Sequence, residues 1–241
     1  MTRLKSSISI ERGKVFEEFI SQVLEKDLGL DVLRNVYIAD LDKCKVHEID
    51  VLLLARGIVY CIECKNYSGK VIGGLCNTYW SVYYDSGMYY KVYSPVFQNK
   101  KHVELLRSLL SSKVLPQSKV YDLLYPVSCT GQRKIPKDFN CVSEKVDFYN
   151  NVLNNIIIKD LVLFPDDTDL WVNRCEGIVE KVSEFVDEAE GLMPLEDRRV
   201  YEFLSLYKHN SSGLQEMLQR TIRGYEPTKE ELILLSNGGI G

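Results

Sequence analysis

Charged side chains interrupt two apolar runs, residues 47–54 and residues 58–65, which are separated by a short break containing Gly57. The charged residues at issue are Glu48, Asp50, Glu63 and Lys65. Carboxylate oxygens are preferred ligands of Mg²⁺, which usually takes one or two of them together with water and phosphate oxygens. A lysine beside such an ion can orient a water molecule or stabilise developing negative charge. The residue types therefore indicate a divalent-cation site that acts on a phosphate group.

A β-hairpin is the element that would bring these side chains together, since two runs of β-branched and aliphatic residues flank the break. A four-residue loop at residues 55–58 places Asp50 opposite Glu63. The same register places Glu48 opposite Lys65, and directly opposed Cβ atoms lie about 4.5–5.5 Å apart. Side chains alternate between the two faces of a strand, so Glu63 and Lys65 share a face that Asp50 can also occupy. We expect two carboxylates and one ammonium group to converge there.

The alternative is a ladder of charged cross-strand pairs on a solvated face. Residues 49–54, however, place apolar side chains on both faces of the first strand, as in a buried central strand. Buried carboxylates require a metal ion or a partner. This argument favours a site over a solvated ladder.

Asp50 followed by Glu63-Cys64-Lys65 resembles the Asp…Glu-x-Lys signature of the PD-(D/E)XK nuclease superfamily. More narrowly, several segments in this order resemble a nuclease-related domain, abbreviated NERD. They are residues 48–53, 57–59 and 62–69, Trp80, and residues 94–98. The resemblance covers roughly residues 10–110. It implies an α/β fold, a restriction-endonuclease-like mixed sheet flanked by helices.

The resemblance also implies an activity, metal-dependent hydrolysis of phosphodiester bonds in DNA. Asp50 and Glu63 would hold Mg²⁺ or Mn²⁺, and the backbone carbonyl of Cys64 would add a ligand. Lys65 would position the attacking water or stabilise the transition state. A catalytically degenerate nuclease fold that binds DNA or docks a partner protein is the alternative, and the intact charged residues argue against it.

A helix is expected over residues 10–28, which carry an apolar stripe at helical spacing. Glu17 lies at the edge of that stripe, where a carboxylate is more often solvated or paired. Gly13-x-x-x-Glu17, however, matches the first-helix glutamate that often completes the site in these nucleases. Glu17 is therefore a second-rank catalytic residue and metal ligand.

A second helix is expected from Ser94-Pro95 to about Ser112, because serine caps a helix and proline is tolerated in its first turn. Gln98 lies in that turn, where it can bridge strands or simply cap the core. The resemblance implies that Gln98 orients Lys65 or a phosphate. His102, one turn later, is more often a hydrogen-bonded packing residue than a catalyst.

Tyrosines and glycines are frequent between the hairpin and the second helix, over residues 69–92. Stacking of nucleic-acid bases on these rings is the functional interpretation. A strand meander that buries its rings is the favoured alternative, because aromatic residues are common in strands. Trp80 in particular is expected to be structural.

Charge is distributed unevenly along the 241 residues, whose formal net charge is −4. Residues 1–110 hold 15 Lys and Arg against 13 Asp and Glu, and the remainder holds 15 against 21. A phosphate-binding surface is therefore expected on the first half. Hydrophobic residues at 45% and charged residues at 27% are typical of a globular protein and argue against disorder.

Seven cysteines, an odd number with no signal peptide ahead of them, indicate a reducing cytoplasm rather than a disulfide scaffold. Cys61-x-x-Cys64 is not a zinc half-site in this interpretation, because strand residues three apart point to opposite faces. No stretch approaches the roughly 18 apolar residues of a membrane span. We expect a cytoplasmic protein without membrane contact.

The remainder of the chain is expected to add strands, helices and an annex. Strands are predicted at residues 120–129 and 155–164, a loop at 131–149, and helices at 170–189, 195–207, 214–222 and 229–235. A Thr228-x-x-Glu231 capping box begins the last helix. These patterns divide the chain into a nuclease-like domain, residues 1–190, and a helical annex, residues 191–241. The annex is a packing cap, a homo-oligomer or partner surface, or a substrate-recognition element.

Overall fold

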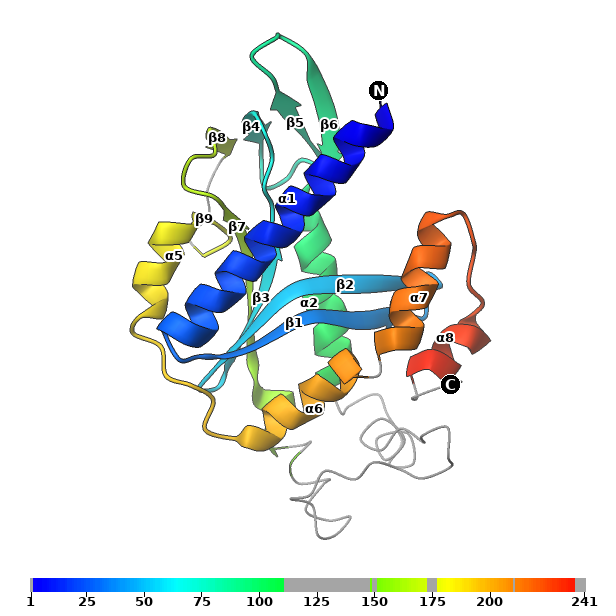
Figure 1. Ribbon diagram of the computed structural model, residues 1–241. Coiled ribbons are helices and arrows are strands. Elements are labelled where there is room, and N and C mark those ends of the chain that lie inside the picture. The colour runs from blue at the N-terminus through cyan, green and yellow to red at the C-terminus, as the bar shows by residue number, and fades with distance from the viewer. Residues whose placement is uncertain (1, 111–147, 149–150, 173–176, 210, 237–241) are drawn as a thin grey trace.

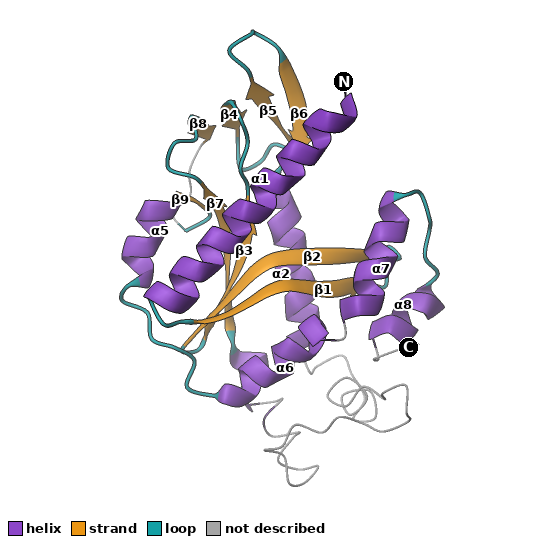
Figure 2. Ribbon diagram, in the orientation of Figure 1, coloured by secondary structure: helices purple, strands orange, loops and turns teal. Residues whose placement is uncertain are grey.

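The chain folds into two β-sheets in the computed structural model, and helices cover both faces of the larger sheet (Figures 1 and 2). The structure describes residues 2–110, 148, 151–172, 177–209 and 211–236. The predicted mixed α/β class is confirmed. The predicted strand at residues 120–129 lies outside the described residues, and so does the predicted loop at 131–149 except for Phe148, which is buried.

The larger sheet has the strand order β1-β2-β3-β7-β9. Its strands are β1 Asp31–Asp40, β2 Lys45–Ala55, β3 Ile58–Cys64, β7 Ile157–Phe164 and β9 Val179–Lys181. The first three strands pair antiparallel, whereas β3, β7 and β9 pair in parallel. Parallel neighbours need a long crossover, and the chain between β3 and β7 includes α2, Pro95–Leu110.

The predicted hairpin is present, and its register is confirmed where the strands pair. Leu54 lies opposite Val59, and the pairing continues to Val51 opposite Ile62. The predicted pairs of Asp50 with Glu63 and of Glu48 with Lys65 fall beyond that last regular pair. Lys65 itself follows the end of β3.

Apolar side chains cover both faces of the larger sheet. The α2-side cluster packs the sheet against α2 and α6, Arg198–His209; its members include Leu33, Val36, Ile49, Leu52, Leu54, Cys61, Val103, Leu106, Phe203 and Leu204. The α1-side cluster packs the other face against α1, Thr2–Gln22, and α5, Val182–Ala189; its members include Phe16, Ile20, Leu24, Val51, Leu53, Ile62, Cys64 and Phe185. Cys61 and Cys64 thus face opposite sides, as predicted.

The first helix begins at Thr2, earlier than predicted, and ends in a π-helical turn, Val23–Asp27. Its buried stripe is narrower than the broad stripe that the sequence predicts from Val15, Phe16, Phe19, Ile20, Val23 and Leu24. Phe16 and Ile20 are buried, but Val15 and Phe19 are 66% and 51% exposed. One row of side chains at helical spacing is enough to cover this side of the sheet.

The smaller sheet has the order β6-β5-β4-β8 and projects beyond the larger one (Figure 1). Its strands are β4 Lys70–Gly73, β5 Tyr79–Tyr83, β6 Tyr89–Tyr93 and β8 Leu170–Val172. Trp80 is 1% exposed and donates a hydrogen bond from Nε1 to the Gly74 carbonyl at 3.1 Å, so its structural role is confirmed. The prediction that the tyrosine rings are buried is wrong for Tyr79, Tyr83 and Tyr89, because alternation along β5 and β6 turns them outward.

The helix predicted at residues 170–189 is wrong over its first half. Among the described residues of this segment, 170–172 form β8, 179–181 form β9, and only Val182–Ala189 is helical, as α5. Leu170 and Val172 turn one face toward the core of the smaller sheet, beside Phe164. Parallel pairing with β4 and β7 therefore outweighs helical propensity in this segment.

Three helices follow the predicted break near residue 191: α6, then α7 Ser211–Ile222, then α8 Lys229–Ser236. The capping box of α8 is confirmed, since Thr228 N donates to Glu231 Oε2 at 2.9 Å and Glu231 N donates to Thr228 Oγ1 at 3.2 Å. Phe203 of α6 belongs to the α2-side cluster. The division between residues 190 and 191 stays a prediction.

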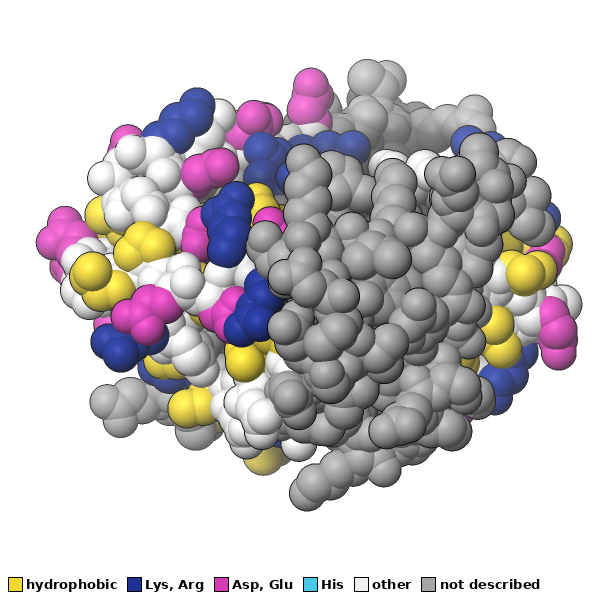
Figure 3. All heavy atoms as spheres, turned by 90° about the horizontal axis from the view of Figure 1, so that it is seen from below, with side chains coloured by type: hydrophobic (Ala, Val, Ile, Leu, Met, Phe, Trp, Pro, Cys, Tyr) yellow, Lys and Arg dark blue, Asp and Glu magenta, His cyan; other side chains and the backbone are white. Residues whose placement is uncertain are grey.

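The surface and the helices add two observations. Seen from below, basic and acidic side chains are interspersed with apolar ones over the described part of that face (Figure 3). None of the described helices is both long enough and apolar enough to cross a membrane.

Candidate active site

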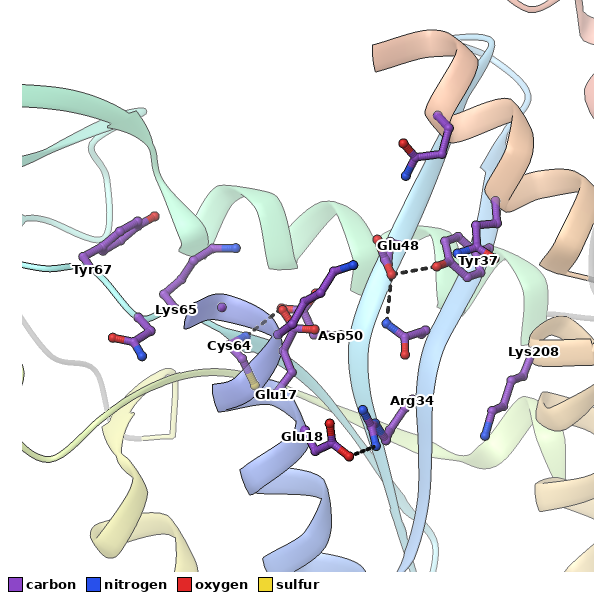
Figure 4. A pocket seen from close by; sticks show the side chains of 16 residues that line it. Glu17, Glu18, Arg34, Tyr37, Glu48, Asp50, Cys64, Lys65, Tyr67 and Lys208 are labelled. Carbon is purple, nitrogen blue, oxygen red and sulfur yellow. Dashed lines mark hydrogen bonds and ion pairs between the residues drawn. The ribbon is translucent and has the colours of Figure 1, made fainter. Parts of the chain in front are cut away.

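An open cavity of about 730 Å³ lies between α1, the β1–β2 pair, the segment after β3 and the helices α6 and α7 (Figure 4). Its size is in the range of small-ligand sites. The lining residues are Gly13, Lys14, Glu17, Glu18, Arg34, Asn35, Tyr37, Glu48, Asp50, Cys64, Lys65, Asn66, Tyr67, Lys208, Gln215 and Gln219. Predicted site residues therefore meet side chains from both ends of the chain.

A break in the β1–β2 pairing exposes Asp50 to this cavity. Asn35 is missing from the regular pairs of β1 and has a left-handed backbone, with φ of 50°. Ile49 packs in the α2-side cluster, whereas Val51, two residues later, packs in the α1-side cluster. Residues two apart in a regular strand share a face, so the alternation is interrupted at Asp50. Asparagine tolerates the left-handed conformation better than most residues.

Asp50 accepts a hydrogen bond from the backbone N–H of Cys64 at 2.8 Å (Figure 4). Burial raises the pKa of Asp50 well above its ordinary value, and the nearby carboxylates of Glu63 and Glu17 raise it further. Lys65 and the Cys64 N–H act in the opposite direction. The positive charge and the N–H group near Asp50 are therefore not enough to offset its burial and the neighbouring carboxylates.

Glu17 and Glu48 extend this acidic cluster. Burial and the charge of Glu48 raise the pKa of Glu17. Glu48 is held in place because Oε1 accepts hydrogen bonds from Asn35 Nδ2 at 2.9 Å and from Tyr37 Oη at 2.8 Å. The β1–β2 register places Tyr37 directly opposite Glu48, which is the sequence signal that could have identified this pair.

Lys65 lines the cavity and also contacts Glu63, whose carboxylate accepts a hydrogen bond from the Lys65 ammonium group. Glu63 is fully buried and is absent from the described residues that line the cavity. Its other oxygen, Oε2, lies 3.3 Å from His102 Nδ1, although the orientation of the two groups does not meet hydrogen-bond geometry. His102 is 2% exposed, so it occupies a packing position beside Glu63.

Charge pairing dominates the protonation of this pair. Burial by itself raises the pKa of Glu63, but the Lys65 ammonium group and His102 outweigh it and hold that pKa below its ordinary value. Burial by itself lowers the pKa of Lys65, but the carboxylates of Glu63 and Asp50 raise it above its ordinary value. Lys65 is therefore an ammonium group at neutral pH.

Gln98 lies half-buried in the first turn of α2 and does not line the cavity. The amide that bridges strands is its neighbour Asn99, which is fully buried. Asn99 Nδ2 donates to the carbonyl of Cys61 on β3 at 2.8 Å and to that of Leu161 on β7 at 3.0 Å. It also contacts the carboxylate of Asp160. Helical spacing alone does not reveal which of two adjacent amides faces the sheet.

The donor chemistry of the cavity fits a hard divalent cation. Asp50 and Glu17 supply carboxylate oxygens, and burial together with neighbouring carboxylates raises the pKa of both groups, an unfavourable environment for two anions that a cation would relieve. Within the described part of the chain, no group of three or more His, Cys, Asp or Glu side chains is arranged to hold a metal ion. Mg²⁺ does not require one, because water and substrate phosphate complete its shell.

Sequence patterns did not predict the contribution of the last helices to this cavity. Lys208 of α6 and two glutamines of α7, Gln215 and Gln219, form part of its wall. The two glutamines are four residues apart and therefore share one face of α7. Together with Lys14 and Arg34, these residues surround the carboxylates with cations and amides.

The family model described as "Nuclease-related domain" (NERD) matches residues 12–127. The matched segment contains Glu17, Asp50, Glu63, Lys65 and Gln98. The predicted restriction-endonuclease-like fold, a mixed sheet flanked by helices, is confirmed. The curated proteins and the solved structures compared with the chain contain no match.

Proposed function

Because the chain contains a nuclease-related (NERD) domain of the PD-(D/E)XK superfamily, we propose that it is a divalent-cation-dependent nuclease that hydrolyses phosphodiester bonds of DNA. The observation that carries the proposal is the cavity in which Asp50 and Glu17 lie with the Lys65 ammonium group. Carboxylates without sufficient counter-charge beside a fixed cation suit the binding of Mg²⁺ and a phosphate.

Asp50 and Glu17 would hold Mg²⁺ or Mn²⁺ at the cavity wall, and the Cys64 N–H would fix the orientation of the Asp50 carboxylate. The bound ion would supply an activated water molecule and neutralise charge on the scissile phosphate. The carbonyl of Cys64 stays a proposed additional ligand.

Lys65 acts as a fixed positive charge in this proposal. Its raised pKa disfavours the neutral amine, so Lys65 is suited to stabilise negative charge on the phosphate rather than to accept a proton. Glu63 maintains that charge through its contact with the ammonium group. Direct binding of the metal by Glu63 stays a prediction, because its carboxylate contacts Lys65 and His102.

Gln98 has the more distant role in the proposal. It lies outside the cavity wall, so orientation of Lys65 or of a phosphate by Gln98 requires a substrate that extends past the cavity. Lys208, Gln215 and Gln219 are better placed to contact such a substrate, since they already line the cavity. Amide and ammonium groups donate hydrogen bonds to phosphate oxygens.

The second candidate is a catalytically inactive nuclease fold that binds DNA or docks a partner protein. It is favoured by one observation, that the carboxylate of Glu63 contacts Lys65 and His102 and that Glu63 is not among the described residues that line the cavity. The two functions differ in one measurable property. Only the first one breaks phosphodiester bonds.

The test is incubation of the full chain with linear, covalently closed circular and single-stranded DNA, and with RNA, in Mg²⁺, Mn²⁺ or EDTA. The proposal expects cleavage of at least one DNA form in metal, none in EDTA, and none by the Asp50→Asn variant. Cutting of closed circles would identify an endonuclease. Binding of DNA without cleavage under every metal condition would support the inactive fold instead.

A further inference from the structure

The outer face of the smaller sheet carries five exposed aromatic rings. We call it the aromatic face and define it by Tyr79, Tyr83, Tyr89, Tyr93 and Trp171, which are 61%, 37%, 56%, 49% and 61% exposed. The opposite face of the same sheet packs Trp80 and Val82 against β7 and α2. Aromatic rings dominate core and interface energetics, and a cluster this exposed is typical of a binding surface.

Cross-strand pairing holds four of these rings in two pairs. Tyr79 lies opposite Tyr93, with ring centroids 6.0 Å apart in an edge-to-face arrangement. Tyr83 lies opposite Tyr89, with centroids 5.1 Å apart and an interplanar angle of 24°. The pairs are four residues apart on β5, which corresponds to about 13 Å along a strand. The rings therefore form a regular platform before any ligand arrives.

Positive charge lies among the rings. Lys70 is opposite Tyr83 in the sheet and places Nζ 3.8 Å from the centroid of the Trp171 ring. Lys91, opposite Ser81, lies between Tyr89 and Tyr93 on β6. None of the four strands of this sheet contains an acidic residue. The nearest acids in sequence are Asp85 in the β5–β6 turn and Asp169, which accepts a hydrogen bond from Trp171 Nε1.

We propose that the aromatic face binds single-stranded nucleic acid, with bases stacked on the rings and phosphates near Lys70 and Lys91. Stacking needs open base faces, which a single strand presents and a duplex hides. Alternating rings and lysines match the alternation of bases and phosphates, whereas an obligate protein interface has a core depleted of lysine. The chemistry is shared by DNA and RNA.

The location of the face links it to the proposed nuclease site. β4 begins five residues after Lys65, so the two lie within about 18 Å along the chain. In this proposal, a nucleic-acid strand held near Lys70 extends toward the cavity. The idea that the face delivers a strand to the cavity rests on the proposed function. Binding of nucleic acid to the face does not rest on it, because binding is measured without cleavage.

The chain contains a built-in probe of this surface. It has two tryptophans, of which Trp80 is 1% exposed and Trp171 is 61% exposed. Oligonucleotide is titrated into the full chain in EDTA, and tryptophan fluorescence is recorded. We expect single-stranded DNA to quench the fluorescence and the Trp171→Phe variant to lose most of that response. Matched arms use RNA of the same sequence, a duplex, and an abasic strand of equal length.

Ring removal and charge removal are tested by separate variants. The pair Tyr83→Ala and Tyr89→Ala should raise the dissociation constant for single strands about 10- to 100-fold, since each lost stacking contact has a large effect. Tyr83→Phe with Tyr89→Phe keeps the rings and should bind as the parent chain does. Lys91→Ala should reduce the salt dependence of binding by about one unit of slope. Phe19→Ala, which removes an exposed ring from α1, is the matched control.

Three results would overturn the proposal. One is equal affinity for the abasic strand, which would mean that only phosphates are recognised. Another is a phenylalanine pair that binds as weakly as the alanine pair, since stacking would then not matter. The third is self-association abolished by the ring variants, with no oligonucleotide bound, which would identify a protein interface. Binding is recorded in EDTA, where no cleavage is expected, so failure of the nuclease function is distinguishable from failure of this one.

Discussion

The carboxylate of Asp50 is buried beside other carboxylates, and this environment determines the effect of substituting Asp50. Burial and the carboxylates of Glu63 and Glu17 raise its pKa. Asp50→Asn keeps the side-chain volume and removes the repulsion, so we expect DNA cleavage to be lost while the melting temperature in EDTA stays equal or rises. Cleavage assays and thermal melting measure the two effects.

Asp85→Asn is the matched control, because Asp85 is an exposed turn residue. It should change neither cleavage nor melting. An Asp50→Asn chain that cuts at the parent rate would place the site elsewhere.

Lys65 supplies the fixed positive charge at the cavity. Lys65→Ala should lower turnover at saturating Mg²⁺ about 10²- to 10³-fold, the usual effect of removing one donor that stabilises transition-state charge. Because it also leaves Glu63 buried without its partner, the variant should be less stable, and turnover is therefore expressed per folded chain. Lys65→Arg, which keeps the charge, should retain the fold.

The opposite pattern would contradict the role assigned to Lys65. In that pattern, turnover of Lys65→Ala would be near normal at saturating metal, and only the Mg²⁺ concentration needed would rise. A metal titration of the parent chain and the variant distinguishes the two.

His47 predicts a specific pH dependence of stability. Burial, aided by the nearby ring of His102, lowers the pKa of His47 from 6.5 to about 4. The folded chain binds this proton less readily than the unfolded chain. The contribution of His47 to the free energy of unfolding should therefore be fully present above pH 6.5 and be lost as the pH falls toward 4. His47→Gln should flatten that decrease.

Urea unfolding at pH 7.5, 5.5 and 4.5 tests the assignment. The difference between the parent chain and His47→Gln removes the contributions of carboxylates common to both. An identical pH profile for the two chains would mean that His47 is not responsible.

At the scale of elements, α2 is held to the sheet by the amide of Asn99 as well as by apolar contacts. Asn99→Ala leaves a buried carbonyl on each of β3 and β7 without this donor. We expect it to lower the free energy of unfolding by about 1–3 kcal/mol. Chemical denaturation measures the change.

Gln98→Ala is the neighbouring control, and its side chain is half-buried. Its effect on stability should stay within about 0.5 kcal/mol, as for most substitutions outside buried networks. A larger loss for Gln98 than for Asn99 would reverse the assignment of the bridging amide.

At the scale of the whole molecule, the C-terminal helix α6 shares the core of the larger sheet. Phe203 of α6 belongs to the same cluster as the strand residues Leu33 and Leu52. Phe203→Ala should therefore destabilise the entire chain by about 3–5 kcal/mol. Urea unfolding followed by both circular dichroism and tryptophan fluorescence should show one transition that shifts as a unit. Trp80 reports on the smaller sheet, remote in sequence from α6.

Ile222→Ala is the control, because Ile222 is 71% exposed on α7. It should leave the transition unchanged. A Phe203→Ala chain in which the fluorescence transition stays constant while part of the circular dichroism signal is lost earlier would show that residues 191–241 unfold as a separate unit.

Local patterns in the sequence by themselves determined several elements of this protein. Four features follow from neighbouring residues: the hairpin register from Leu54 opposite Val59, the start of α2 directly after Ser94, the capping box at Thr228 and the buried position of Trp80. Turn length, side-chain alternation and cap chemistry act over a few residues, so these features are readable without the rest of the chain. The Asp…Glu-x-Lys spacing was readable for the same reason.

Tertiary structure decided which face each of these side chains meets. Alternation predicts two faces for β5 but not which one is covered, and packing against β7 left the tyrosines outside. Asn35 on β1 has a left-handed backbone where the alternation of β2 is interrupted at Asp50. The carboxylate of Glu63 contacts Lys65 and His102. Gln215 and Gln219 line the same cavity as Asp50, although they lie 165 and 169 residues after it in the sequence. Such contacts depend on long-range burial, which local periodicity does not encode.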